Sequence, residues 1–285
     1  MKPKVVWLQG VTCNGNSHSF VNLSGLDTLL QRYEWLYHPI LPSSLSLMQL
    51  WDAKCDILVI EGGAKKGWQK GEGELEKLFL HLAQKAKKVV AVGSCAVYGG
   101  VFKEFDDTIC GVLFDGENKS RYYDMLADKT INIPGCPAHP EWIAFALEAE
   151  NPSLDSFHRP KELYAYTVHS GCVRNEYFEW KIDAEDFGTK EGCLFYKQGC
   201  QGPFTHGSCN KILWNETASK TRVGTPCFGC TEPDFPKQDL FSTKTYMGIP
   251  ATMPLGVPKR AYLTITGIAK SFHIPRLTKR LLDED

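Results

Sequence analysis

Hydrophobic residues in the first half of the chain gather in short runs separated by polar, helix-like stretches. Four runs are apolar and rich in β-branched residues, as buried parallel strands are: 5–9, 57–60, 89–92 and 131–133. Residues 73–82 place apolar side chains at three- and four-residue spacing, which predicts a helix, and 140–148 is a second helix candidate. This alternation predicts βαβ units in an open parallel sheet, an α/β domain of flavodoxin-like type.

The second half of the chain has little regular periodicity and is rich in Gly, Pro and Cys. One stretch, 258–272, has a pattern compatible with a helix. Residues 151–160 contain two prolines and are interpreted as a linker, so the predicted domains are 1–155 and 156–285. Because so little regular structure supports the second domain, we expect bound metal clusters to supply its order.

Charge and length exclude several classes of protein. The 285 residues carry 32 basic and 33 acidic side chains, a net charge of 32 − 33 = −1. This balance argues against a broad basic face for nucleic acid and against a highly charged disordered chain. No apolar run approaches the roughly 20 residues of a membrane span, and the first residues lack the apolar region of an export signal. We therefore expect a cytoplasmic protein without a transmembrane segment, any membrane association being made through partners.

The 11 cysteines are the unusual feature of the composition. In a short secreted chain such a number would suggest a disulfide framework. This chain is long, has an odd number of cysteines and shows no export signal, so its cysteines favour metal or redox chemistry.

A first group of cysteines follows the predicted strands. Cys13, Cys95 and Cys136 each come a few residues after a strand, and the carboxyl ends of parallel strands meet at one edge of a sheet. We expect the three thiols to converge there. Glu61 ends a strand at the same edge, either as a neighbour of this metal site or as a solvated or capping carboxylate.

Two other cysteines do not fit that pattern. Cys55 precedes its strand, so it is expected at the opposite edge as a small buried hydrophobic residue. Cys110 lies in a loop and is also interpreted as a small buried hydrophobic residue.

The second group contains six cysteines and one histidine in a single stretch: His169, Cys172, Cys193, Cys200, Cys209, Cys227 and Cys230. Seven soft ligands divide into four, enough for a cubane cluster, and three, enough for a cluster with one iron fewer. Zinc is the alternative, since HxxC and CxxC pairs are common in zinc sites. Two zinc sites require about eight ligands, so the spacing favours iron–sulfur clusters over zinc, with disulfides third.

Several motifs together resemble the small, electron-transfer subunit of nickel–iron hydrogenases, over nearly the whole chain. They are Val6-Trp7-Leu8-Gln9-Gly10, Glu61-Gly62, Gly93-Ser94-Cys95-Ala96, Pro134-Gly135-Cys136-Pro137, His169-Ser170-Gly171-Cys172, Gly199-Cys200-Gln201-Gly202-Pro203, Cys209 with Trp214-Asn215, Pro226-Cys227-Phe228-Gly229-Cys230 and Pro233-Asp234-Phe235-Pro236. The resemblance implies a flavodoxin-like domain followed by an irregular iron–sulfur domain.

The resemblance also implies ligands for three clusters. The proximal cluster is implied on Cys13, Cys95 and Cys136; a medial 3Fe-4S cluster on Cys209, Cys227 and Cys230; a distal 4Fe-4S cluster on His169, Cys172, Cys193 and Cys200. Pro233 stands where the medial set lacks a fourth ligand, as in the family. The nickel–iron centre is implied in a partner large subunit, in an obligate heterodimer or a larger oligomer. Electrons are expected to leave to an acceptor such as a quinone or a carrier protein.

The chain departs from the family at Asn16, where the family pattern has a second cysteine after Cys13. The proximal cluster then is a 3Fe-4S cluster, a 4Fe-4S cluster with Asn16, water or Glu61 on the odd iron, or a cluster that recruits another cysteine such as Cys110. Losing one anionic sulfur is expected to raise the cluster's reduction potential. This favours an uptake hydrogenase that feeds a quinone-level acceptor.

Three other functions remain open from the sequence. One is a hydrogen-sensing regulatory subunit with the same architecture. Another is an electron-transfer subunit of a complex-I-like assembly, which should lack the stretch from His169 to Cys230. The last is a zinc-stabilised interaction protein.

Overall fold

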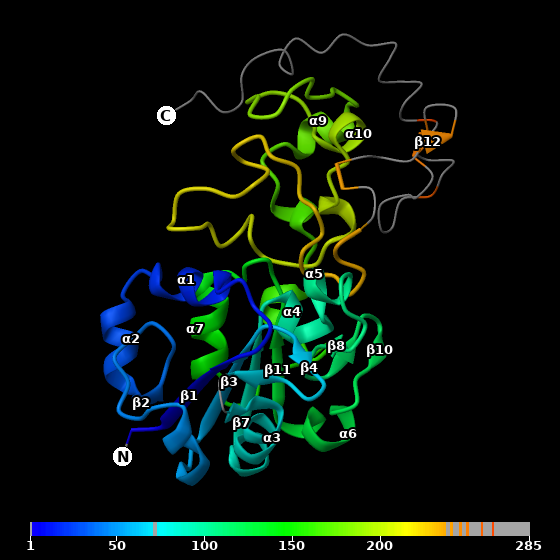
Figure 1. Ribbon diagram of the computed structural model, residues 1–285. Helices are drawn as coiled ribbons and strands as arrows, with labels where there is room; N and C mark the ends of the chain where they lie inside the picture. The colour runs from blue at the N-terminus through cyan, green and yellow to red at the C-terminus, as the bar shows by residue number, and fades with distance from the viewer. Residues whose placement is uncertain are drawn as a thin grey trace. The chain divides into compact units, whose positions relative to one another are not determined.

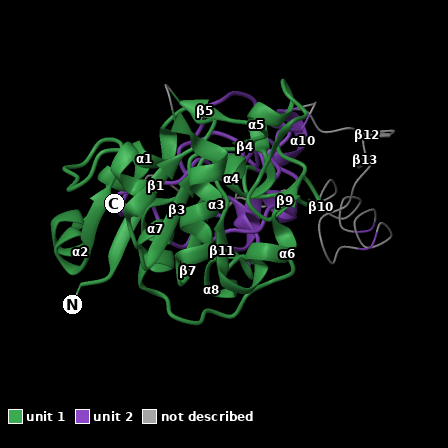
Figure 2. Cartoon of the chain, turned by 60° about the horizontal axis from the view of Figure 1, so that its bottom comes forward, with its two compact units in different colours: residues 1–165, 230–235 green, residues 166–229, 236–285 purple. Residues whose placement is uncertain are grey.

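The computed structural model describes residues 2–70, 73–237, 240–241, 245–246, 249–250, 258 and 264. The chain forms two compact units (Figure 2). Unit 1 contains residues 1–165 and 230–235, and unit 2 contains residues 166–229 and 236–285. The predicted boundary after residue 155 therefore falls inside unit 1.

Unit 1 is built on a five-stranded parallel sheet in the order β11-β7-β3-β1-β2 (Figure 1). Its strands are β1 (Lys4–Gln9), β2 (Glu34–Tyr37), β3 (Ile57–Glu61), β7 (Lys88–Val92) and β11 (Thr130–Ile133). Counted along the chain, this is the 2-1-3-4-5 order of flavodoxin-like sheets, which confirms the predicted fold class. The strand that the sequence did not predict, β2, is a short edge strand with only one fully buried residue.

Helices cover both faces of this sheet. Helix α3 (Leu75–Lys85) shares a core with Val6, Leu58 and Val89 on one face. On the other face, Phe20 of α1 (Gly15–Val21) lies 5.2 Å from the ring of Trp7. The predicted helix at 140–148 is α7 (Pro140–Glu148), whereas the one predicted from residue 73 begins at Leu75 because residues 73 and 74 form a short strand.

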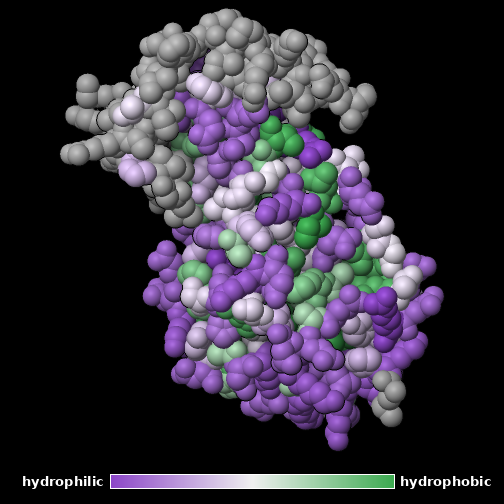
Figure 3. Space-filling view, turned by 180° about the vertical axis from the view of Figure 1, so that it is seen from behind, coloured by the Kyte–Doolittle hydropathy of each residue, from purple (hydrophilic) through white to green (hydrophobic). Residues whose placement is uncertain are grey.

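The remaining elements of unit 1 are short. They are α2 (Leu26–Arg32), α4 (Ser94–Tyr98), α5 (Gly100–Lys103), α6 (Tyr123–Leu126), α8 (Lys161–Tyr164), the 3-10 helices η1 (Met48–Asp52) and η2 (Ala127–Lys129), and the two-residue strands β4 (Ala64–Lys65), β5 (Gln69–Lys70), β6 (Gly73–Glu74), β8 (Ile109–Cys110), β9 (Phe114–Asp115) and β10 (Asn118–Lys119). On the face shown in Figure 3, the surface of unit 1 is mainly hydrophilic. Most of its large apolar residues are enclosed in the core, which also contains Cys55 and Cys110, although Phe105 is exposed.

The segment interpreted as a linker is part of unit 1. The backbone N–H of Asn132, in β11, donates to the His158 carbonyl at 2.9 Å, and its side-chain amide donates to the Phe157 carbonyl at 2.8 Å. Leu154 also forms an isolated β-bridge with Pro160. These bonds attach the segment to the sheet, so proline content alone was a poor guide to the boundary.

The part of unit 2 that the structure describes is mainly irregular chain, as expected. Its described elements are η3 (Val168–Gly171), α9 (Asn175–Glu179), α10 (Phe195–Gln198), η4 (Gly202–Phe204), β12 (Thr245–Tyr246) and β13 (Ile249–Pro250). Its core combines aromatic and aliphatic side chains with three thiols, those of Cys193, Cys200 and Cys227. The predicted helix at 258–272 lies outside the described residues, apart from isolated positions. Within the described residues, no helix is long and apolar enough to span a membrane.

Candidate cluster sites

The three thiols of the first group lie at the carboxyl edge of the sheet. Cys13 follows β1, Cys95 lies in α4 directly after β7, and Cys136 follows β11. Burial, together with the neighbouring Cys136 and Cys13 thiols, raises the pKa of Cys95 to about 11. Because the surrounding protein favours a neutral Cys95 thiol, a bound cation has to supply the charge that holds thiolates here.

Glycines leave room beside these sulfurs. A Cβ at Gly100, where φ is +53°, would lie 2.9 Å from the Cys95 sulfur, and one at Gly15 would lie 3.2 Å from the Cys13 sulfur. The backbone N–H groups of Val101 and Phe102 donate to Cys95. Close backbone and N–H···S contacts are typical of iron–sulfur sites.

Glu61 forms a hydrogen-bonded centre at the same edge. The residue is fully buried, and its carboxyl group accepts bonds from six donors. These are Trp7 Nε1 at 3.0 Å, Gln9 Nε2 at 3.4 Å, Thr12 Oγ1 at 3.4 Å, the backbone N–H groups of Asn16 and Ser17 at 3.0 Å each, and Ser17 Oγ. The structure therefore shows Glu61 as a capping group for the first turn of α1, and it is not solvated.

Asn16 is buried between the loops that carry Cys95 and Cys136. Its side-chain oxygen accepts a bond from the Ala138 N–H at 2.8 Å. Its amide nitrogen lies against Gly93, where a Cβ would come within 2.3 Å of it. The oxygen of Asn16 therefore already has a donor. Cys110 is also committed elsewhere, buried in the core with its sulfur 3.8 Å from the Ala64 carbonyl oxygen.

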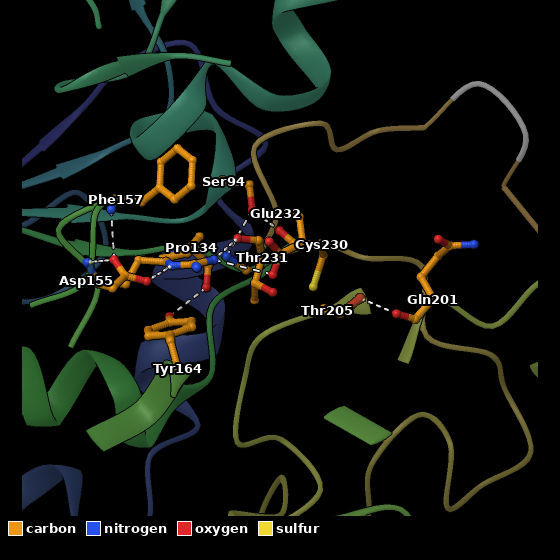
Figure 4. Close-up of polar contacts among 12 residues, drawn as sticks. Ser94, Pro134, Asp155, Phe157, Tyr164, Gln201, Thr205, Cys230, Thr231 and Glu232 are labelled. Atoms are coloured by element: carbon orange, nitrogen blue, oxygen red, sulfur yellow. Dashed lines mark hydrogen bonds and ion pairs between the residues drawn. The ribbon is translucent and has the colours of Figure 1, made fainter. Parts of the chain in front are cut away.

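Sequence reasoning missed a polar junction in unit 1 that involves Ser94. The Ser94 hydroxyl donates to the carbonyl oxygen of Cys230 (Figure 4) and accepts from the Gly135 N–H at 2.9 Å. Ser94 directly precedes Cys95, and Gly135 directly precedes Cys136. One hydroxyl therefore joins the backbones of three segments that carry predicted ligands.

Arg159 anchors the residues that follow Cys230. Its Nη1 donates to the Thr231 carbonyl at 3.1 Å and lies 3.4 Å from a Glu232 oxygen. Its Nε bonds Asp155 at 2.7 Å (Figure 4). The buried guanidinium group is thus paired with two carboxylates. Desolvation lowers its pKa, but the attraction of Tyr98, Glu232 and Asp155 outweighs this and raises the pKa above its usual value.

The four predicted distal ligands line one cavity in unit 2. His169, Cys172, Cys193 and Cys200 all face it, together with Arg174. Burial raises the pKa of Cys193 and of Cys200 to about 12 each and lowers the pKa of His169. Lowering the histidine pKa keeps the imidazole neutral, which is the form that binds metal. Three thiols and one imidazole form a donor set that fits an iron–sulfur cluster.

Backbone N–H groups also reach these sulfurs. The Phe195 N–H donates to Cys193 Sγ at 3.4 Å, and the Cys227 N–H donates to Cys200 Sγ at 3.3 Å. Such bonds tune the potential of iron–sulfur clusters. Among the described residues, no three His, Cys, Asp or Glu side chains stand close enough to hold a single metal ion.

The predicted medial ligands fall in both units. Cys227 is buried in the core of unit 2, where burial raises its pKa to about 12, and Cys209 packs against that core. Cys230 begins the segment that belongs to unit 1. The medial ligand set stays a prediction from the sequence.

Comparisons with known proteins address the two halves of the chain separately. Residues 13–149 match the family model of the NADH ubiquinone oxidoreductase 20 kDa subunit. Residues 164–242 match the model of the C-terminal part of the NiFe/NiFeSe hydrogenase small subunit. The periplasmic [NiFe] hydrogenase small subunit of Solidesulfovibrio fructosivorans is 32% identical, over 82% of this chain and 79% of that protein. The chain belongs to the small-subunit family of nickel–iron hydrogenases.

Two further members support this membership. The quinone-reactive Ni/Fe-hydrogenase small chain of Wolinella succinogenes is 30% identical, over 81% of this chain and 71% of that one. The actinobacterial-type NiFe-hydrogenase of Ralstonia eutropha H16 superposes with a TM-score of 0.70 at 25% identity, over 96% of this chain and 92% of that chain. The C-terminal match covers His169 to Cys230, the stretch that a complex-I-like subunit was expected to lack. Hydrogenase small subunits work with a large catalytic subunit and transfer electrons.

Proposed function

We propose that this chain relays electrons from hydrogen oxidation in the large subunit, through three iron–sulfur clusters, to an acceptor at quinone level. Each H₂ gives two protons and two electrons, and the electrons pass singly along the clusters. The observation that carries the proposal is the cavity of unit 2, which His169, Cys172, Cys193 and Cys200 line together. Iron–sulfur clusters would supply the one-electron chemistry, and the chain supplies ligands, dry surroundings and N–H donors.

The proximal cluster is proposed to have three thiolate ligands, from Cys13, Cys95 and Cys136. The oxygens of Asn16 and Glu61 already accept N–H bonds, which favours a 3Fe-4S cluster, or a 4Fe-4S cluster with water on the odd iron. With one anionic sulfur fewer, the cluster is expected to have a raised potential. A raised potential supports the uptake direction, in which electrons leave hydrogen.

The acceptor and the compartment are separate proposals. The Wolinella relative is named quinone-reactive, which supports a quinone-level acceptor. For the compartment we propose the cytoplasm, although the Solidesulfovibrio relative is named periplasmic. Cell fractionation tests the compartment: recovery of the complex with periplasmic proteins would show that the cytoplasmic proposal is wrong.

The function is tested by metal and sulfide analysis of the complex purified natively without oxygen. Subtracting any iron of the partner, we expect about ten irons per chain with a 3Fe-4S proximal cluster and about eleven with a 4Fe-4S one. Stoichiometric nickel should accompany the large subunit. Zinc in place of iron, with no nickel partner, would overturn the proposal. A kinase bound in place of an electron acceptor would instead indicate the hydrogen-sensing role.

A further inference from the structure

A second buried arginine, Arg174, lines the distal cavity of unit 2. Only 1% of its surface is exposed. Its Nε donates to the Thr221 carbonyl at 2.7 Å, and its Nη1 donates to the carbonyls of Gly192 at 2.7 Å and Glu191 at 3.1 Å. Its Nη2 donates to the Thr189 carbonyl. Every acceptor is a neutral backbone carbonyl.

The charge of Arg174 therefore lacks an acidic partner among the described residues. Arg159, which is 4% exposed, shows the usual arrangement, with Asp155 and Glu232 as ion-pair partners. Arg174 instead lines the same cavity as Cys172, Cys193 and Cys200. A buried cation is costly unless an anion compensates it. The three cysteines are the predicted distal ligands.

We propose that Arg174 is the internal counter-charge of the distal cluster. This inference rests on the proposed function. A 4Fe-4S cluster with three thiolate ligands carries net negative charge, which grows when the cluster accepts an electron. A fixed guanidinium group facing the same cavity stabilises the reduced cluster more than the oxidised one, because attraction between opposite charges grows with the charge. Arg174 thereby raises the reduction potential of the distal cluster and draws electrons toward it.

Arg174 also has a structural role, since its N–H groups hold the carbonyls of residues 189, 191 and 192, just before Cys193. The two roles make different demands on the side chain. To act as a counter-charge, the side chain at position 174 needs one positive charge. The structural role requires several donors in the shape of a guanidinium group. Lysine preserves the first and glutamine preserves neither.

The test compares three variants in the complex with the large subunit, by EPR-monitored redox titration of the distal cluster. We expect Arg174→Gln to shift the midpoint potential to more negative values and Arg174→Lys to keep it close to the wild-type value. Arg222→Gln is the matched control, because it removes the same charge from an exposed position directly after the cavity residue Thr221. Its charge is screened by solvent, so the potential should not move.

Two results would overturn the inference: an unchanged potential in Arg174→Gln, or a shift in Arg174→Lys as large as in Arg174→Gln. If the neutral variant does not assemble, iron content decides. Iron retained by the lysine variant and lost from the glutamine variant supports the counter-charge, whereas loss from both indicates a purely structural role. The wild-type metal count separately tests the proposed function, since zinc in the wild-type complex would refute that function whatever the variants do.

Discussion

The two units of the chain differ in what fills their cores. In unit 1 the core is a continuous set of aliphatic and aromatic side chains on a parallel sheet. Among the described residues of unit 2, three of the nine buried core members are cysteines, and the regular elements are no longer than five residues. Burying a large apolar side chain stabilises a fold by about 1.5–3 kcal/mol, whereas a buried thiol without a metal contributes less. We infer that unit 1 draws its stability from its own side chains and that unit 2 depends on a bound group.

The two buried arginines follow the same division. Arg159 of unit 1 has its anions within the protein, in Asp155 and Glu232. Arg174 of unit 2 has only carbonyl oxygens among the described residues. The buried arginine of unit 1 is therefore compensated by carboxylates of the chain, whereas the compensating charge that we propose for Arg174 is the distal cluster.

Removal of iron should give the largest difference in stability between the two units. When the native complex is treated anaerobically with a chelator, residues 166–229 should lose most of their amide-exchange protection, while β1, β3 and β7 keep theirs. The reason is that metal binding and folding are coupled where a core consists of ligands. Hydrogen exchange with mass spectrometry measures both regions in one sample, with untreated complex as control. Equal loss of protection in both units would contradict the comparison.

Glu61→Gln tests whether unit 1 depends on its own polar contacts. One carboxyl oxygen becomes an NH₂ group that faces buried donors, which should lower the free energy of unfolding by about 3 kcal/mol. Urea unfolding followed by tryptophan fluorescence measures the change. Glu34→Gln is the control, because its exposed ion pair with Lys4 should contribute less than about 1 kcal/mol. An equal effect of the two substitutions would show that the Glu61 network is not stabilising.

His38 should give unit 1 a pH dependence that involves no metal. Burial lowers its pKa from 6.5 to about 4, and its ring packs 4.8 Å from that of Trp7. The His38 imidazole binds a proton more readily in the unfolded chain than in the folded one. The contribution of neutral His38 to the free energy of unfolding is therefore complete above about pH 6.5 and is lost as the pH falls toward 4. Between pH 7.5 and pH 5 the loss should be about 2 kcal/mol. Urea titrations at both pH values measure this loss of unfolding free energy. If the His38→Phe variant showed the same pH dependence as the wild type, other groups would be responsible for it.

Asn16→Cys should have the smallest effect on stability and would sharpen the comparison at the proximal site. Losing the bond to the Ala138 N–H should lower the free energy of unfolding by about 1 kcal/mol. The restored thiolate should lower the proximal potential and, for a 3Fe-4S cluster, add about one iron. Iron analysis and redox titration measure these changes. Asn22→Cys, on the exposed end of the same helix, should change neither.

The sequence predicted what depends on local pattern. Residues 57–60 are all apolar and form a central strand, and the position of each cysteine after a strand placed Cys13, Cys95 and Cys136 at one edge. The short, half-exposed strand β2 was not predicted, because its pattern of apolar residues is too weak. The roles of Ser94 and Arg174 were not predicted for a different reason: both roles depend on burial and on partners that are distant in the sequence. The Ser94 bond to Cys230 joins residues 136 positions apart, and no local pattern records such a bond.

The six donors around Glu61 have a consequence for protein engineering. The loop that carries Cys13 is a short motif in the sequence, yet its conformation is held by a side chain 48 positions beyond that cysteine, on a different strand. Transplanting residues 10–17 into another scaffold would therefore transfer the ligand without its support. The smallest portable version of this loop includes the pair of adjacent strands, β1 and β3, together with the first turn of α1.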